Sequence, residues 1–372
     1  MTAGRSGSAA FGAPFELPPL AGDRADWLNL LADGLYGPVP APPDRLVATP
    51  LGALGEGAKH LLIEMDVGGR AMRVDAALWL PAGHDGPVPL ICGLGFLGPV
   101  GVLRGDRFPL DPAARVLAPE GLGAGDGRLT QDMRGQAAYR WPVDQITQAG
   151  FGLLLTCYGS WVPDDVRVWR DQGLWELLDG PDCGAISLWA WAYSRMVDAA
   201  LALPQVDGGR VVVAGHSRLG KAALWAAATD ERIAAVYGNN PGCAGAAPAR
   251  HNVGETLSRM VERFPHWLKP GVETDPDARV FDQHVALAAV APRRVYLASA
   301  RDDLWADPVG SYMALMAAAP VWGAVPDWPS PEEMWTTGGQ QMAPHMGHHL
   351  RDGVHEMLSE DWTQALRFLS QT

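Results

Sequence analysis

The sequence lacks any long uninterrupted run of apolar residues, although 48% of its 372 residues are hydrophobic. No window approaches an uncharged apolar stretch of about 18 residues, which excludes a membrane-spanning helix. The first twenty residues contain Gly, Ser, Ala and Pro rather than the apolar core of a signal peptide. We therefore expect no membrane partner and, by sequence, a cytoplasmic protein.

Positive charge is also scarce, because 29 Lys and Arg stand against 42 Asp and Glu, for a net charge of −13. Surfaces that bind nucleic acids or anionic membranes neutralise phosphates with clustered basic residues, so the sequence excludes both functions. Cysteine is rare too, and no pair has CxxC spacing. We predict buried free thiols rather than disulfides or zinc ligands at Cys92, Cys157, Cys183 and Cys243.

Short apolar runs typical of buried strands recur at residues 46–49, 60–65, 71–80, 88–94, 151–157, 210–214, 233–237 and 294–298. Helical stretches lie among the later runs, at residues 185–203, 218–228 and 309–319. This alternation predicts an α/β protein with a mostly parallel central sheet flanked by helices, a three-layer sandwich. We expect the first three strands to pair in antiparallel fashion.

No repeat or linker divides the chain. We predict an N-terminal extension over residues 1–35 and a single domain over residues 36–372. Two segments, at about 101–139 and 161–182, are long, rich in Gly and Asp and poorly periodic. Such segments are typical of long loops over a functional site.

A candidate nucleophile, Ser217, lies in a tight turn between a predicted strand and an Ala-rich helix. A strand-to-helix elbow exposes a serine oxygen and directs the amides at the helix N-terminus toward a developing oxyanion. The usual elbow pattern is G-x-S-x-G, but here Leu219 and then Gly220 follow. The alternative is that Ser217 only caps the helix.

An acid and a base are expected downstream, since the α/β-hydrolase chain order is Ser, acid, His. The strand at residues 294–298 is followed by three acids, of which we favour Asp303, with Asp302 and Asp307 as alternatives. One of the three could instead cap the helix that begins near Pro308.

His355 is the candidate base, because it follows a glycine in a loop just before the last helix, residues 360–369. Three nearby histidines, His345, His348 and His349, raise the alternative of a metal-dependent hydrolase. No matching set of Cys, His or carboxylate ligands accompanies them, so we expect neither a metal nor another cofactor.

At this point the sequence resembles the glucuronoyl esterases, carbohydrate esterase family 15, and most closely their bacterial branch, over about residues 36–368. The resemblance is carried by the stretches Gly-Ala-Ile-Ser-Leu-Trp-Ala-Trp191, Gly-His-Ser-Arg-Leu-Gly-Lys221, Phe-Asp-Gln-His284, Ala-Pro-Arg-Arg294, Trp-Ala-Asp-Pro308 and Arg-Asp-Gly-Val-His355. The family carries G-x-S-R-x-G-K at its nucleophile, which accounts for the unusual elbow. The resemblance implies an α/β-hydrolase fold and a serine esterase of lignocellulose degradation that cleaves the ester between a 4-O-methyl-glucuronoyl unit and an alcohol.

The resemblance also implies a role for each matching residue. Ser217 matches the nucleophile and His355 the general base, while Arg218 matches an arginine that helps to hold the oxyanion. Sugar-binding positions of the family match Lys221, Glu255 and Trp305. Without the resemblance, the simpler interpretation of Lys221 and Glu255 is an ion pair. We expect Arg218 and Lys221 to make the pocket locally cationic, which suits a glucuronate product.

One departure concerns the acid. Many members carry a glutamate where this chain has Asn240, and an asparagine cannot stabilise a forming imidazolium by charge. The carboxylate of the catalytic triad is therefore expected from Asp303. A second departure is the glycine-rich segment at residues 93–98, which is more apolar than the family pattern.

Tryptophan is unusually frequent, with 15 copies against 7 Tyr and 8 Phe. Because an indole N–H requires a partner when it is buried, the surplus suggests some stacking surfaces as well as core packing. We expect Trp189, Trp191 and Trp225 in the core. We expect an outer sugar cleft to be walled by Trp161, Trp169 and Trp175.

Two other functions compete with the glucuronoyl esterase hypothesis. One is an acetyl xylan esterase or other acyl esterase on the same fold, and the other is a non-catalytic carbohydrate-binding protein derived from an esterase. The expected partner is a carbohydrate ester, and we expect a monomer. Members of the family are commonly exported, which differs from the compartment that this sequence predicts.

Overall fold

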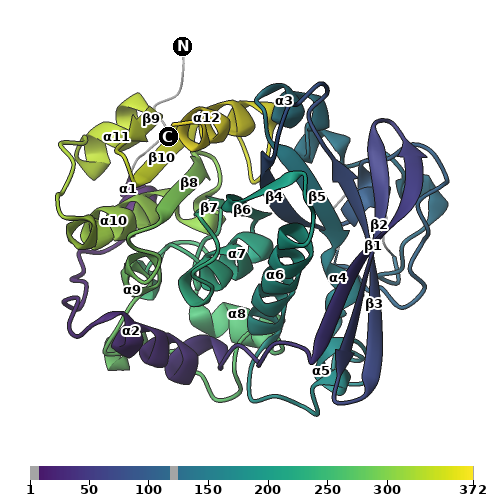
Figure 1. The fold of residues 1–372 in the computed structure, drawn as a ribbon. Helices are drawn as coiled ribbons and strands as arrows, with labels where there is room; N and C mark the ends of the chain where they lie inside the picture. Colours follow the sequence, from purple (N-terminus) through teal and green to yellow (C-terminus); the bar gives the residue numbers. More distant parts are fainter. Residues whose placement is uncertain (1–7, 118–124, 372) are drawn as a thin grey trace.

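One ten-stranded sheet organises the computed structural model, which describes residues 8–117 and 125–371 (Figure 1). The strand order is β1-β2-β3-β5-β4-β6-β7-β8-β10-β9. The strands are β1 (Arg45–Gly55), β2 (Ala58–Val67), β3 (Arg70–Trp79), β4 (Val88–Gly95), β5 (Gly152–Cys157), β6 (Val206–His216), β7 (Ala235–Asn239), β8 (Arg294–Ala300), β9 (Gly339–Met342) and β10 (Met346–Arg351).

The sheet is parallel through its centre and antiparallel at both margins. Strands β5, β4, β6, β7, β8 and β10 pair in parallel, whereas β1, β2 and β3 pair antiparallel and β9 closes the other edge in antiparallel fashion. The predicted α/β class and the antiparallel start are confirmed. Because parallel strands end at the same edge of a sheet, residues that follow β6, β7, β8 and β10 lie close together.

The helices are α1 (Ser8–Phe11), α2 (Arg24–Leu31), α3 (Val143–Gln148), α4 (Tyr158–Trp161), α5 (Leu174–Leu177), α6 (Ala185–Leu201), α7 (Arg218–Thr229), α8 (Leu257–Arg263), α9 (His284–Ala288), α10 (Pro308–Ala318), α11 (Pro331–Thr337) and α12 (Ser359–Leu369). Figure 1 shows α6 and α7 side by side on one face of the sheet. Helices α3 and α12 contact each other and cover the opposite face. The outcome is the three-layer sandwich that the sequence predicts.

Large aromatic side chains fill the layer under α6 and α7. Trp189, Trp191 and Trp225 are fully buried, as predicted, and the Trp225 indole donates a hydrogen bond to Ser187 Oγ at 2.8 Å. Tyr36 stacks on Trp225 with ring centroids 4.9 Å apart. The segment that precedes residue 36 thus packs on the same core through α2.

The predicted loops at about 101–139 and 161–182 consist mainly of turns and short helical segments, with residues 118–124 outside the described residues. All four cysteines are buried and free, as predicted. Across residues 8–117 and 125–371, no helix is long and apolar enough to cross a bilayer.

Strand β10 does not show the apolar pattern of a buried strand, because polar side chains of this strand are buried. His349 Nε2 lies 2.8 Å from Asp361 Oδ1 on α12, and the Arg351 guanidinium donates to the same carboxylate at 2.9 Å. His348 points to the other face, where its ring lies 5.0 Å from that of Tyr312 on α10. Neighbouring residues of a strand face opposite sides, so these two imidazoles cannot ligate one ion.

We predict that Asp361→Ala lowers the free energy of unfolding by about 3–5 kcal/mol, since it leaves Arg351 buried without its counter-charge. Burial raises the pKa of Asp361, but its histidine and arginine donors outweigh burial and lower it. The wild-type stabilisation is therefore present above the unfolded pKa of an aspartate and is lost as pH falls through the folded one.

Urea unfolding at neutral and acidic pH measures both effects. Glu64→Ala is the matched control, because its ion pair with Arg73 is solvent-exposed and contributes about 0–1 kcal/mol. Equal losses of unfolding free energy for the two variants would contradict the stabilising role of the buried Asp361–Arg351 ion pair.

Candidate active site

Ser217 lies in a sharp turn between β6 and α7, with φ 57° and ψ −125°. A positive φ is strained for a residue with a side chain, and such strain is concentrated at functional sites. The turn requires two glycines, because a Cβ on Gly215 would lie 2.1 Å from the Leu219 carbonyl oxygen and one on Gly220 would lie 3.1 Å from the Gly215 oxygen. The Ser217 side chain makes no capping hydrogen bond to α7, so its oxygen is left for other partners.

The structure pairs His355 with Asp303. His355 Nδ1 lies 2.5 Å from Asp303 Oδ2, and the Ala306 amide donates to the other carboxylate oxygen at 3.2 Å. These residues follow β10 and β8, which are parallel neighbours, so the fold itself brings them to one edge. The contact fixes the orientation of the imidazole and leaves its Nε2 directed away from the carboxylate.

The other two acids have different surroundings. Asp302 is exposed, and Asp307 accepts hydrogen bonds from His251 Nδ1 at 2.7 Å and from the Gly310 amide at 2.8 Å. Asp307 is therefore the residue that caps α10. Of the three candidates, the structure places Asp303 on His355.

A cavity of about 180 Å³ contains most of the predicted residues. Its lining consists of Phe96, His216, Ser217, Arg218, Lys221, Asn240, Gly242, Glu255, Arg263, Phe264, Trp267, Trp305, Ala306 and His355. Asp303 lies behind His355, and Trp305 is 42% exposed at the rim. The structure therefore brings most of the predicted residues together, and it adds His216 and an aromatic wall of Phe96, Phe264 and Trp267 that the sequence analysis missed.

Arg218 is held by a buried carboxylate that the sequence gives no sign of. Asp164 accepts hydrogen bonds from Arg218 Nη1 at 2.6 Å and from Tyr158, His266 and Trp267, each at 2.8 Å. Burial alone would raise the pKa of Asp164, but the arginine and the other donors hold it well below its usual range. The Arg218 guanidinium also lies 4.7 Å from the Trp267 ring centroid. Both contacts fix one position for Arg218.

Lys221 is paired as well. Its ammonium donates to Glu255 Oε2 at 3.0 Å and to the Cys243 carbonyl at 2.6 Å, and both charged side chains are buried. The expectation of a locally cationic pocket is wrong for these residues, because Arg218 and Lys221 each have a carboxylate of their own.

The expected outer cleft of tryptophans is wrong for Trp161 and Trp169, whereas Trp175 is half-buried and packs on Trp169 with ring centroids 4.5 Å apart. Trp161 and Trp169 are buried, and the Trp161 indole donates to Thr156 Oγ1 at 2.9 Å inside the core. The aromatic wall of the site comes instead from Phe264 and Trp267, whose rings stack in parallel with centroids 3.9 Å apart.

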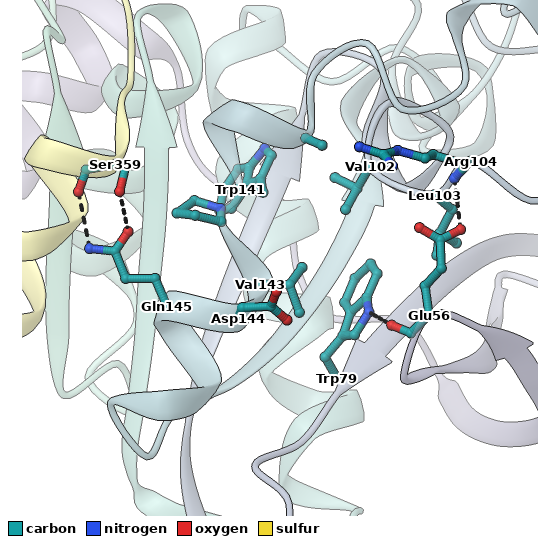
Figure 2. Close-up of a pocket in the computed structure, with 12 residues that line it drawn as sticks. Glu56, Trp79, Val102, Leu103, Arg104, Trp141, Val143, Asp144, Gln145 and Ser359 are labelled. Carbon is teal, nitrogen blue, oxygen red and sulfur yellow. Dashed lines mark hydrogen bonds between the residues drawn. The ribbon is translucent and has the colours of Figure 1, made fainter.

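A larger hollow, of about 580 Å³, lies between β3, α3 and the turn that joins β1 to β2 (Figure 2). Figure 2 shows two of its hydrogen bonds, one from the Ser359 hydroxyl to Gln145 Oε1 and one from the Trp79 indole to the backbone carbonyl of Glu56. Its described lining contains no histidine, and its one serine, Ser359, donates its hydroxyl to Gln145. The larger of the two cavities is therefore not the one that contains Ser217 and His355.

A metal centre is not apparent in the described part of the chain. It contains no group of three or more His, Cys, Asp or Glu residues that could hold an ion. Of the three histidines considered from the sequence, His345 is exposed, whereas His348 and His349 point to opposite faces of β10.

We predict that Gly215→Ala lowers both stability and turnover, because the added methyl would overlap backbone atoms of Leu219 and displace Ser217. Gly209→Ala, in the same strand β6, is the control, since its Cβ would meet only Asp207 at 3.5 Å. Thermal unfolding and ester hydrolysis measured on both variants check this. A Gly215→Ala protein as active as Gly209→Ala would contradict the elbow geometry.

Comparison with known proteins identifies esterases as relatives of this chain, which agrees with the arrangement of Ser217, His355 and Asp303. A family model described as glucuronyl esterase of fungi matches residues 163–326. The relative named carbohydrate esterase MZ0003, from an unknown prokaryotic organism, is 30% identical over 348 residues, covering 90% of this chain and 80% of that protein. A 4-O-methyl-glucuronoyl methylesterase from Cerrena unicolor is 33% identical over 172 residues, which cover 41% of this chain and only 35% of the fungal protein.

Two solved structures are similar over nearly their full length. One, described as a promiscuous CE15 esterase from a marine bacterial metagenome, has a TM-score of 0.85 and 29% identity, covering 97% of this chain and 98% of that one. A glucuronoyl esterase from Solibacter usitatus has a TM-score of 0.83 and 30% identity, covering 98% of this chain and all of that one. With these relatives and this fold, the chain belongs to the glucuronoyl esterases of carbohydrate esterase family 15, which are carboxylic ester hydrolases.

Proposed function

We propose that this esterase cleaves the ester between a 4-O-methyl-glucuronoyl unit and an alcohol, with Ser217, His355 and Asp303 as its catalytic triad. The observation that carries the proposal is the contact of 2.5 Å between His355 and Asp303, in the cavity where the strained turn presents Ser217. The similarity of this chain to a 4-O-methyl-glucuronoyl methylesterase and to a glucuronoyl esterase supports the substrate class.

In the first half of the reaction, Ser217 Oγ attacks the ester carbonyl while His355 Nε2 takes its proton. Asp303 keeps the Nδ1–H tautomer of His355 and stabilises the imidazolium that forms. The imidazolium then gives its proton to the departing alcohol. In the second half, water attacks the acyl-serine with His355 as base again, which releases the free acid and restores Ser217.

The oxyanion of each tetrahedral intermediate is stabilised by Arg218 and by the amides at the N-terminus of α7. Such donors contribute most when they are fixed before the reaction, because no reorganisation is then needed. Asp164 and the Trp267 ring supply that fixation here, since they hold the guanidinium from two sides.

The acid half of the ester would lie against Lys221, Glu255 and Trp305. Two of the three ammonium hydrogens of Lys221 are used by Glu255 and Cys243, which leaves one for a sugar hydroxyl. The exposed Trp305 indole offers a flat apolar face for the sugar ring. An adjoining hollow of about 350 Å³ shares Arg263 and Phe264 with the cavity and gives room for the rest of a substrate larger than an acetyl ester.

We predict that Ser217→Ala and His355→Ala each lower the turnover of a methyl glucuronate ester by about 10⁶-fold, since the triad acts as a unit. Asp303→Asn is expected to cost about 10⁴-fold, because the amide cannot stabilise the imidazolium. Asp302→Asn is the neighbouring control and should leave turnover within a few-fold. The triad assignment fails if Ser217→Ala keeps near-normal turnover, and a mild Asp303→Asn effect would move the acid role elsewhere.

We predict that Trp305→Ala raises KM for the glucuronate ester about tenfold with little change in kcat, because stacking on the sugar contributes about 1.4 kcal/mol. The fold is expected to persist, since this side chain is at the rim. Steady-state kinetics and a melting curve check both statements. A lower kcat at unchanged KM would assign the indole to the reacting carbonyl instead.

A second candidate function, a broader acyl esterase, is favoured by the structural relative described as promiscuous. The same triad would then act on smaller acyl groups. Rates on a methyl glucuronate ester and an aryl acetate, measured side by side with the Ser217→Ala control, separate the two functions. Sugar binding without turnover of either ester would instead indicate a non-catalytic binding protein.

A further inference from the structure

A second histidine lies against the proposed base. His216, the last residue of β6, is 3% exposed, lines the cavity and has its ring centroid 4.6 Å from that of His355, with the planes tilted by 40°. The Phe96 ring contacts it edge to face at 5.9 Å. No step of the mechanism above uses this imidazole.

A backbone amide determines which atoms donate and which accept in the hydrogen-bond network around His216. The Ala300 N–H donates to Asn240 Oδ1 at 3.0 Å, so the other end of this side chain must be its NH₂ group. That group donates to the Glu356 carbonyl at 3.2 Å and to Asn239 Oδ1 at 3.0 Å. The orientation of Asn240 therefore sets the orientation of Asn239.

His216 Nδ1 lies 2.5 Å from the same Asn239 Oδ1. Because an amide oxygen only accepts, Nδ1 must carry the hydrogen, and Nε2 of the neutral ring is a bare acceptor. This nitrogen makes no hydrogen bond to any side chain or backbone group in residues 8–117 and 125–371. It belongs to a ring that lines the cavity beside Ser217 and His355.

The surroundings keep His216 uncharged. Burial is the main cause that lowers its pKa well below the usual value, and His355, Arg140 and Arg218 add unfavourable charge. The nearest carboxylates face other groups, since Asp303 binds His355, Asp164 binds Arg218 and Glu356 binds Arg140. An uncharged ring with a free Nε2 can only accept a hydrogen bond at that atom.

We propose that His216 is a catalytic hydrogen-bond acceptor for an O–H group bound in the cavity, and that Asn240 holds the tautomer that makes it one. The inference deepens the proposed function and rests on it. Two O–H groups have this chemistry: the water that hydrolyses the acyl-serine and a hydroxyl of the sugar. The attacking water gives one proton to His355, and its second O–H requires an acceptor, which His216 Nε2 supplies without any change of bonds.

The proposal gives Asn240 a function at the position where many family members carry an acid. A carboxylate there could not donate to Asn239, which would then be free to turn its NH₂ group toward His216. A carboxylate at position 240 would also favour the protonated form of His216. That imidazolium would have no acceptor for its Nε2–H and would lie against the His355 ring. Asparagine avoids both effects.

Nitrogen-15 spectra of the histidine-labelled wild-type protein test the tautomer directly, with His216→Gln used to assign the signals. We expect His216 to remain neutral at mildly acidic pH, with a protonated Nδ1 and a bare Nε2. A protonated Nε2, or titration of His216 near pH 6.5, would overturn the proposal. This result does not depend on turnover, so it stands even if the esterase assignment fails.

Kinetics test the acceptor. His216→Phe keeps a ring against His355 and Phe96 but has no acceptor, and we expect about a tenfold loss of kcat/KM, the value of one hydrogen bond. His216→Gln, which can place an oxygen near Nε2, is expected to lose less. The matched control is His60→Gln in β2, whose imidazole binds Asp75 rather than the cavity. Melting curves verify that each variant is folded.

The substrates identify the O–H group. A kcat loss on both a methyl glucuronate ester and an aryl acetate, with accumulated acyl-enzyme, indicates the water, whereas a loss on the glucuronate ester alone indicates a sugar hydroxyl. Full activity of His216→Phe on both esters would refute the proposal. His355, as the base, already gives the pH profile of kcat/KM an acidic limb. Asn240→Asp is expected to add a second ionisation to this limb and make it steeper, because a raised His216 pKa removes the acceptor at low pH. An unchanged profile would show that Asn240 does not hold the tautomer.

Discussion

The close approach of Gly215 to the start of α7 is the constraint on which the site depends. It allows β6 to turn directly into the helix with Ser217 at positive φ, which directs both the side chain and the first helical amides toward the same cavity. The neighbouring parallel strands deliver Asp303 and His355 to the same edge. Three strand ends, those of β6, β8 and β10, are thus enough to bring Ser217, Asp303 and His355 together.

Local pattern and chain order yielded Ser217 and Asp303 as candidates because each follows an apolar strand, and His355 because it lies in a loop just before the last helix. They could not predict Asp164, whose four donors come from three distant places in the chain, at Tyr158, at Arg218 and at the neighbours His266 and Trp267. Strand β10 was missed because its polar side chains are buried through pairing with Asp361. Trp161 was misplaced because a loop position does not reveal that an indole points into the core.

The polar groups around the cavity form a connected network rather than isolated pairs. Asn240 links the last backbone amide of β8 to the loop that carries His355, and through Asn239 it reaches His216, the residue before Ser217. Because the Ala300 amide fixes the orientation of Asn240, the donors and acceptors of Asn239 and of His216 Nδ1 are fixed in turn. The asparagine at position 240 therefore connects three parts of the site through hydrogen bonds, some of which a carboxylate could not make.

The pairing of each buried cation with its own carboxylate has a consequence for the end of the catalytic cycle. Arg218 is balanced by Asp164, and Lys221 by Glu255, before any substrate enters. The ester is neutral at its reacting group, but the acid that leaves is an anion. Because both buried cations already have a partner, neither presents an unbalanced positive charge to that anion.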